Sequence, residues 1–148
     1  MGEESQGKTA VICEDEGTTM IYIRQVLKLA GVRVLSAVNT GVEAVAQVLE
    51  HRPDLIFMDI HMPLMSGTEA LRLIRAADPD YRPVIIMVTA FDDEEHRKKA
   101  AEAGAGGYVV KPFTGRLLLQ ELERVCATHF SVAPERQSSG RRAQPPGI

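Results

Sequence analysis

The chain has 148 residues, 45% of them hydrophobic and 25% charged, which are ordinary values for one globular domain. Its net charge of −3 indicates neither a general nucleic-acid binder nor a protein of anionic membranes. The two cysteines share no motif spacing, no stretch approaches the ~18 apolar residues of a membrane span, and the polar start over 1–8 has no signal-peptide core. We expect a cytoplasmic protein with no membrane insertion and no direct nucleic-acid binding.

Short apolar runs typical of strands alternate along the chain with longer amphipathic stretches typical of helices. The expected strands are Thr9–Cys13, Val32–Ala37, Asp54–Met58, Val84–Val88 and Gly107–Val110. The expected helices are Thr18–Ala30, Gly41–Glu50, Thr68–Ala77, Asp93–Ala103 and Arg116–His129.

Residues that often end helices stand at the expected boundaries. Gly31 and Gly104 occupy C-cap positions, and Asn39-Thr40 and Asp92 occupy N-cap positions. Five strand–helix units in succession predict an α/β fold in which helices cover both faces of a parallel sheet. Right-handed crossovers leave few topologies, and we expect a five-stranded, doubly wound, flavodoxin-like sheet of strand order 2-1-3-4-5 with five helices.

The two ends of the chain differ in character from its middle. We expect a flexible N-terminus over 1–7 and a single domain over 8–130. Residues 131–148 contain three Pro, three Arg and three Ser and have no helical period, which predicts a disordered tail.

Polar side chains follow four of the expected strands at the point where each strand ends. Glu14-Asp15 follow the first strand, Asp59 the third, Thr89 the fourth and Lys111 the fifth. Doubly wound sheets bind ligands outside the carboxyl ends of their strands, at the switch point that here lies between strands one and three. We therefore expect these side chains to lie together, and an acid pair, an acid, a hydroxyl and a lysine predict a phosphoryl-transfer site.

A group of carboxylates needs a cation, because two unit charges ~5 Å apart in an effective dielectric of ~20 repel by about 3 kcal/mol. Oxygen-only ligands point to Mg²⁺, with Mn²⁺ as the alternative. Beside this metal, Asp59 is the expected nucleophile and forms an acyl phosphate. Lys111 is expected to pair with the transferred group, and the Thr89 hydroxyl to donate a hydrogen bond to it.

With these motifs, the chain resembles the receiver domains of bacterial two-component response regulators, especially the single-domain, CheY-like chemotaxis type. The resemblance covers about residues 8–128. Asp15 and Asp59 are 44 residues apart, Thr89 follows 30 residues later and Lys111 another 22, in agreement with the family. The motifs that carry it are VICEDE at 11–16, DIHMPLMSG at 59–67, VTA at 88–90 and GYVVKPF at 107–113.

The resemblance implies that Asp59 accepts phosphate from a phosphohistidine on a sensor histidine kinase or a histidine phosphotransfer protein and becomes a 4-aspartylphosphate. It implies that Asp15 binds Mg²⁺ directly and Glu14 directly or through water. The backbone carbonyl of His61 is implied as a further ligand. A regulatory phospho-acceptor of this kind assists its own phosphorylation and dephosphorylation but is not an enzyme.

The resemblance also implies how the signal leaves the site. Thr89 and Tyr108 are the implied switch pair: Thr89 moves toward the phosphoryl group and Tyr108 turns inward. The implied output surface is the face of helix four, strand five and helix five, roughly Asp93 to Val125, which contacts an output protein that the sequence does not name. The Lys111-Pro112 bond is expected to be cis.

Two features depart from the usual family pattern. Glu14 replaces the more usual aspartate, and its longer side chain alters metal affinity without abolishing it. His61 and Phe91 stand two residues after the acceptor and two after the threonine, at positions that govern water access to the phosphoryl group in this family. These bulky rings predict slow hydrolysis.

Other functions are weighed against this switch. A phosphorelay intermediate uses the same residues. A Mg²⁺-dependent phosphohydrolase needs a second acid where His61 stands, and a phosphorylation-independent interaction module does not need the complete set of site residues. The sequence has no DNA-binding, cyclase or methylesterase domain after residue 130, so we expect output through protein contacts unless the chain is a fragment of a longer protein. His51, His96 and His129 are expected to be surface residues.

Overall fold

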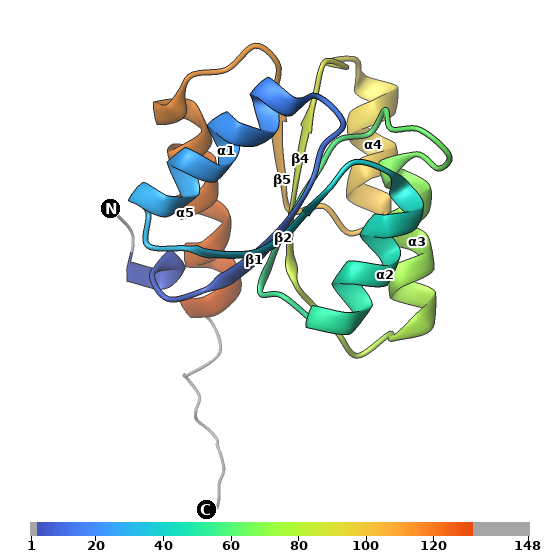
Figure 1. The fold of residues 1–148 in the computed structure, drawn as a ribbon, viewed down its shortest axis with the longest axis horizontal. Helices are drawn as coiled ribbons and strands as arrows, with labels where there is room; N and C mark the ends of the chain where they lie inside the picture. The colour runs from blue at the N-terminus through green and yellow to red at the C-terminus, as the bar shows by residue number, and fades with distance from the viewer. Residues whose placement is uncertain (1–2, 132–148) are drawn as a thin grey trace, which may run out of the picture.

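Five parallel strands form one sheet in the order β2-β1-β3-β4-β5 (Figure 1). The structure is a computed structural model and describes residues 3–131. The predicted α/β class, five-stranded parallel sheet and strand order are confirmed. The strands are β1 (Thr9–Cys13), β2 (Arg33–Val38), β3 (Leu55–Met58), β4 (Val84–Thr89) and β5 (Gly107–Val110).

Helices cover both faces of the sheet, with α1 and α5 on one face and α2, α3 and α4 on the other (Figure 1). Their ends lie within two residues of the predicted ends. The helices are α1 (Gly17–Leu29), α2 (Gly41–His51), α3 (Gly67–Ala77), α4 (Glu94–Glu102) and α5 (Gly115–Ser131).

The central strands are buried on both faces, which is why they read as unbroken apolar runs. Successive side chains alternate between two hydrophobic layers: Ile12 and Phe57 pack beneath α1 and α5, and Val11 and Met58 pack beneath α2 and α3. Both cysteines are free and buried, Cys13 in the second layer and Cys126 in the first. This packing makes the sheet a rigid support for the loops at its carboxyl edge.

Local capping explains most helix boundaries. Thr40 caps α2 as expected, by accepting a hydrogen bond from the Glu43 amide. The prediction that Asp92 caps α4 is wrong: Asp93 is the N-cap, because its carboxylate accepts from the His96 amide, and Asp92 pairs with Arg97 instead.

The described chain begins within the segment 1–7 that was expected to be flexible, and its flexibility stays a prediction. Residues Glu3–Ser5 form a short 3-10 helix, η1, that packs against α5, and Ser5 is 2% exposed. The Gly7 amide donates to the Gly31 carbonyl at 2.9 Å. Of the expected tail, Ser131 ends α5 and residues 132–148 lie outside the described residues. Within residues 3–131, no helix has the length and apolar character to cross a membrane.

Candidate functional site

The carboxyl edge of the sheet gathers the residues that the sequence predicted for the site. Backbone pairing continues past the strands there: the Asp59 amide donates to the Cys13 carbonyl at 2.9 Å, and the Lys111 amide donates to the Thr89 carbonyl at 2.8 Å. These bonds align the ends of β1, β3, β4 and β5. The ends surround a cavity of about 420 Å³ that is lined by Asp15, Glu16, Asp59, His61, Thr89, Ala90, Phe91 and Lys111.

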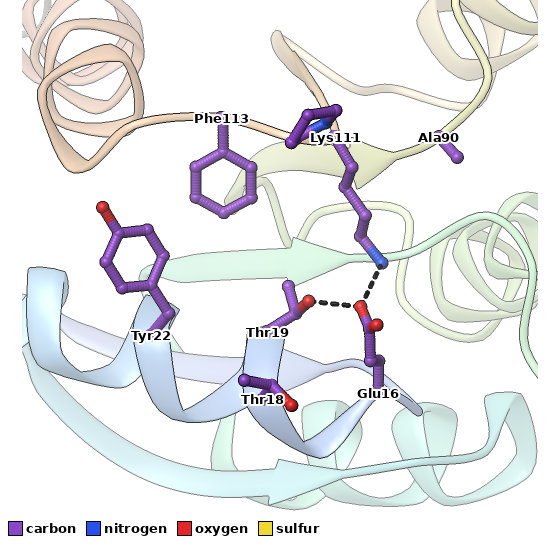
Figure 2. Close-up of a pocket in the computed structure, with 8 residues that line it drawn as sticks. Glu16, Thr18, Thr19, Tyr22, Ala90, Lys111 and Phe113 are labelled. Atoms are coloured by element: carbon purple, nitrogen blue, oxygen red, sulfur yellow. Dashed lines mark hydrogen bonds and ion pairs between the residues drawn. The ribbon is translucent and has the colours of Figure 1, made fainter.

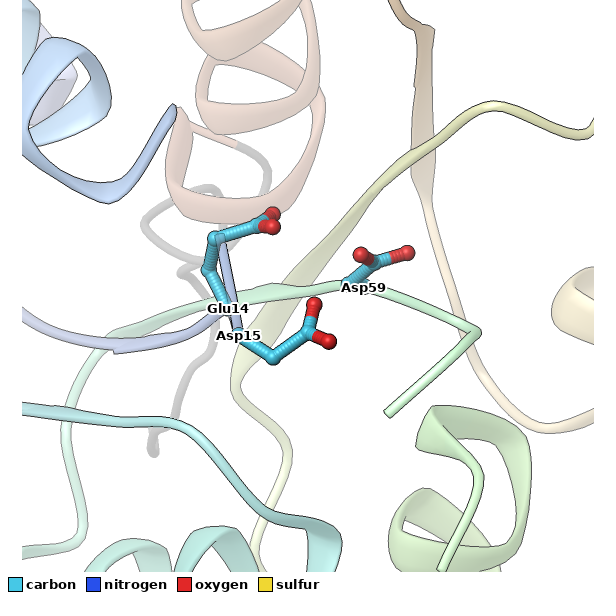
Figure 3. A group of neighbouring side chains, drawn as sticks. All are labelled: Glu14, Asp15 and Asp59. Atoms are coloured by element: carbon cyan, nitrogen blue, oxygen red, sulfur yellow. The ribbon is translucent and has the colours of Figure 1, made fainter. Parts of the chain in front are cut away.

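Three carboxylates meet at this edge (Figure 3). Glu14 and Asp59 are 1% and 5% exposed, whereas Asp15 is exposed. One oxygen from each lies within 4.8 Å of the others. Such crowding of like charge is unfavourable unless a cation is close.

Lys111 supplies one positive charge to these acids. Its Nζ lies 2.9 Å from Glu14 Oε2 and 3.0 Å from Asp59 Oδ2. Burial lowers the pKa of Lys111, but its hydrogen bonds to the two carboxylates outweigh that effect and the pKa is raised overall. Lys111 is therefore a protonated ammonium group. It is hydrogen-bonded to carboxylates that follow β1 and β3. The Lys111-Pro112 bond is cis, as predicted.

Only one of the two carboxylate oxygens of Glu14 is hydrogen-bonded in this arrangement. Its Oε2 accepts hydrogen bonds from Lys111 and from the Glu16 amide, but its buried Oε1 has no hydrogen-bond partner among residues 3–131. Burial raises the pKa of Glu14 to about 7, against the opposing hydrogen bond from Lys111. An unpartnered buried oxygen among oxygen-only donors is what a hard divalent cation would complete.

Thr89 and Tyr108 are linked through the loop that follows β4. Thr89 is fully buried, and its hydroxyl accepts from the Phe91 amide at 3.4 Å. The Tyr108 hydroxyl donates to the Phe91 carbonyl at 2.7 Å, and the guanidinium of Arg97 lies 4.5 Å from the Tyr108 ring centroid. Both members of the predicted switch pair thus bind the backbone of one residue.

Aromatic rings form one wall of the cavity. Phe91 stacks on His96 with centroids 4.1 Å apart and planes at 1°, and its centroid lies 6.1 Å from that of His61. Asp93 holds His96 in place, with Oδ1 2.6 Å from the ring Nδ1. His61 also donates its backbone amide to Asp59 Oδ1 at 3.2 Å.

Two residues that shape the site, His96 and Glu16, were not predicted from the sequence to do so. His96 was expected only as a surface residue, yet it fixes Phe91 by stacking. Glu16 lines the cavity, and its Oε1 lies 3.9 Å from Lys111 Nζ. The acidic run at 14–16 was visible in the sequence, but no spacing rule showed that its third carboxylate turns toward Lys111.

Comparisons with known proteins agree with this geometry. The family model for the response regulator receiver domain matches residues 10–123. Chemotaxis protein CheY of Thermotoga maritima is 32% identical over 119 residues, which are 80% of this chain and 98% of that protein. The phosphate regulon transcriptional regulatory protein PhoB of Pseudomonas aeruginosa is 36% identical over 119 residues, 80% of this chain but 52% of PhoB, so the chain spans about half of that relative's length.

Solved structures show the same likeness. The receiver domain of the sensor histidine kinase PA1611 from Pseudomonas aeruginosa, with a magnesium ion coordinated in its active site cleft, aligns with a TM-score of 0.72 at 32% identity and covers 82% of this chain and 98% of that one. A chain of the CheX-CheY-BeF3-Mg complex from Borrelia burgdorferi aligns with a TM-score of 0.76 at 27% identity, and the match covers 81% of this chain and 90% of that one.

Proposed function

Because this chain belongs to the response regulator receiver domain family and is a phosphorylation-dependent signalling switch, we propose that Asp59 is its phosphate acceptor. One observation carries the proposal. Asp59 is a nearly buried carboxylate at the switch point of the sheet, and it faces the cavity with the Lys111 ammonium 3.0 Å from Oδ2. A nucleophile in that place has a cation ready for an incoming phosphoryl group.

The proposed reaction is phosphoryl transfer from a phosphohistidine of a sensor histidine kinase or a histidine phosphotransfer protein. An Asp59 oxygen attacks phosphorus, an O–P bond forms as the P–N bond breaks, and the donor imidazole leaves with the bond's electron pair. Lys111 transfers its hydrogen bonding from the two carboxylates to a phosphoryl oxygen, and the Thr89 hydroxyl donates a hydrogen bond to another. The chain's contribution is positioning and charge stabilisation.

The proposed cofactor is Mg²⁺, with Mn²⁺ as an alternative. Glu14, Asp15 and Asp59 would hold it, and the backbone carbonyl of His61 stays a predicted fourth contribution. When bound, the cation offsets the charge of the carboxylates and of the phosphoryl oxygens. The unpartnered Oε1 of Glu14 and the all-oxygen donor set support this assignment, as does the magnesium ion in the related receiver domain.

The proposed switch connects Thr89 to Tyr108 through Phe91. When the Thr89 hydroxyl turns to the phosphoryl group, it no longer accepts the 3.4 Å hydrogen bond from the Phe91 amide. The Phe91 carbonyl accepts a hydrogen bond from the Tyr108 hydroxyl. A movement of Phe91 would therefore change the position of the Tyr108 side chain on β5. The α4–β5–α5 face would then present a changed surface to an output protein.

Intact-mass spectrometry after incubation with acetyl phosphate tests the acceptor. We expect a Mg²⁺-dependent gain of one phosphoryl group that base treatment removes and that Asp59→Asn lacks. Asp80→Asn is the matched control, because it makes the same change at an exposed aspartate on the opposite edge of the sheet. Equal labelling of Asp59→Asn and the unmodified protein would refute the proposal.

A further inference from the structure

One carboxylate at the mouth of the site has no part in the proposed transfer. The Glu16 side chain is 61% exposed, and its Oε1 lies 3.9 Å from Lys111 Nζ. The Thr19 hydroxyl donates a hydrogen bond to that same oxygen (Figure 2). The carboxylate is thereby held toward the lysine instead of turning freely in solvent.

The position of Glu16 at the start of α1 makes this orientation informative. A residue at an N-cap usually uses its side chain to accept a hydrogen bond from a helix amide, as Thr40, Ser66 and Asp93 do for α2, α3 and α4. Within the described chain, Glu16 makes no such side-chain bond to α1. Its carboxylate contacts Thr19 and Lys111 in place of a cap.

Glu16 also stands between two cavities. It lines the 420 Å³ cavity that contains Asp59, and it lines a neighbouring cavity of about 720 Å³ whose far side is formed by Tyr22 and Phe113. Lys111 is shared by both cavities. A phosphoryl group that moves from the larger cavity toward Asp59 therefore passes this carboxylate.

The charges at the mouth oppose a free anion. The carboxylates of Glu14, Glu16 and Asp59 lie within 3.9 Å of the Lys111 ammonium, and Asp15 lies beside Glu14 and Asp59. With all four acids ionised, Lys111 and a bound divalent cation would still leave the group at −1. Glu16 supplies that remaining charge. It also competes with the incoming phosphoryl group for Lys111.

We propose that Glu16 is a specificity-determining residue that slows phosphorylation of Asp59 by small anionic donors more than by a phosphohistidine protein. The encounter rate of a small free anion depends on the electrostatic field at the mouth. A docked protein holds its phosphoryl group in place through its own interface, so it loses less to repulsion by one carboxylate. This inference rests on the proposed role of Asp59.

The test compares initial rates of phosphorylation by acetyl phosphate, followed by intact mass, for the unmodified protein, Glu16→Gln and Glu16→Asp. Glu16→Gln keeps an acceptor for Thr19 and removes the charge. We expect it to react roughly three- to tenfold faster at low ionic strength, because one fewer charge repels the donor. The gain should shrink near ~0.5 M salt, and Glu16→Asp should stay close to the unmodified protein.

Two comparisons decide the result. Glu102→Gln removes an equal charge from an exposed position at the far end of α4 and should leave the rate unchanged. A histidine phosphotransfer protein that carries phosphohistidine should show a smaller gain with Glu16→Gln than acetyl phosphate does. An unchanged or slower rate for Glu16→Gln, or an equal gain with both donors, would overturn the role of Glu16. Absence of labelling in every variant, with both donors and Mg²⁺ present, would overturn the acceptor proposal itself.

Discussion

Glu14 is a buried site residue whose ionised form is disfavoured by its surroundings. It is a carboxylate that is 1% exposed, its Oε1 lacks a partner among residues 3–131, and burial raises its pKa to about 7 from an ordinary 4.5. Because the pKa is higher in the folded chain, ionisation of Glu14 lowers the stability of the metal-free protein as pH rises through this interval. At pH 8 the charge is present and the cost is complete.

Substitution of Glu14 by Gln should therefore have opposite effects on stability and on metal binding. We expect Glu14→Gln to raise the free energy of unfolding of the metal-free protein at pH 8 by about 1–3 kcal/mol, because the buried charge of Glu14 itself is removed. It should also reduce the stabilisation that Mg²⁺ provides. Urea unfolding in EDTA and in Mg²⁺ measures both effects. A variant that is destabilised in EDTA at pH 8 would contradict this account.

The aromatic wall makes a prediction about the lifetime of the phosphoryl group. Phe91 is stacked on His96 and lies near His61, so we expect these rings to limit the approach of water to Asp59. We expect Phe91→Ala to lose the phosphoryl group several-fold faster and His96→Ala to lose it faster by a smaller factor. Intact mass followed after removal of the donor gives the rates. His51→Ala, an exposed change on α2, serves as control, and equal lifetimes in all four proteins would exclude the shielding role.

At the scale of elements, α5 protects the exposed edge of the sheet. β5 is an edge strand, and such strands offer unpaired backbone groups to other chains. The Glu121 carboxylate accepts from the Tyr108 amide at 2.8 Å, and Arg124 donates to the Gly106 carbonyl at 3.1 Å and to Glu121. The two α5 side chains thus hold the strand that carries Tyr108 against α5.

The contacts of Glu121 give the protein a defined acid sensitivity. The hydrogen bond from Arg124 lowers the pKa of Glu121 below its ordinary 4.5, with a further contribution from the Tyr108 amide. A lowered folded pKa means that the stabilisation is present above pH 4.5 and is lost as pH falls through the folded value. We expect Glu121→Gln to cost about 1 kcal/mol at pH 7 and progressively less below pH 4.5. Thermal unfolding across this range tests it, and a pH-independent difference would refute the assignment.

The elements could be predicted because their signals are local. Period, apolar runs and capping residues lie within a few positions of each other, and the right-handed crossover rule supplies the topology. The segment at 3–5 could not be predicted, because η1 is held by its packing on α5 and not by a pattern of its own. Asp92 and Asp93 are equally good caps in sequence, and only side-chain direction separates them.

The sequence predicted which residues of the candidate site follow the ends of strands, but not how side chains in the loops are oriented. Parallel strands bring their carboxyl ends to one edge, so the meeting of Asp59 with Lys111 followed from topology. The stacking of Phe91 on His96 and the approach of Glu16 to Lys111 depend on side-chain directions in separate loops. Sequence spacing carries no information about those directions.

At the scale of the whole molecule, the site and the α4–β5–α5 face are joined by a short chain of contacts. Asp59 shares a cavity with Thr89 and Phe91, and Phe91 binds Tyr108, whose ring lies beside Arg97 of α4. The faces of α2 and α3 have no place in this chain. Phosphorylation should therefore alter one side of the molecule selectively.

Hydrogen exchange can detect this selectivity without a partner protein. With Mg²⁺ and acetyl phosphate, we expect changed amide exchange in the 90–102 segment and in β5, and little change in α2. Tyr108→Ala should weaken the change at α4 while Asp59 labelling persists. Asp59→Asn should show no change at all, and an equal response across α2 and α4 would contradict a directed switch.

Burial of both cysteines makes site-specific labelling of this protein practical. Cys13 and Cys126 are 1% and 0% exposed, and burial raises the pKa of both thiols, that of Cys126 to about 11. Neither forms a ready thiolate near neutral pH, so both should react slowly with maleimides and similar reagents. The chain also contains no tryptophan. A cysteine introduced on the α4–β5–α5 face could therefore be labelled selectively with a maleimide. A tryptophan introduced there would be the source of all tryptophan fluorescence.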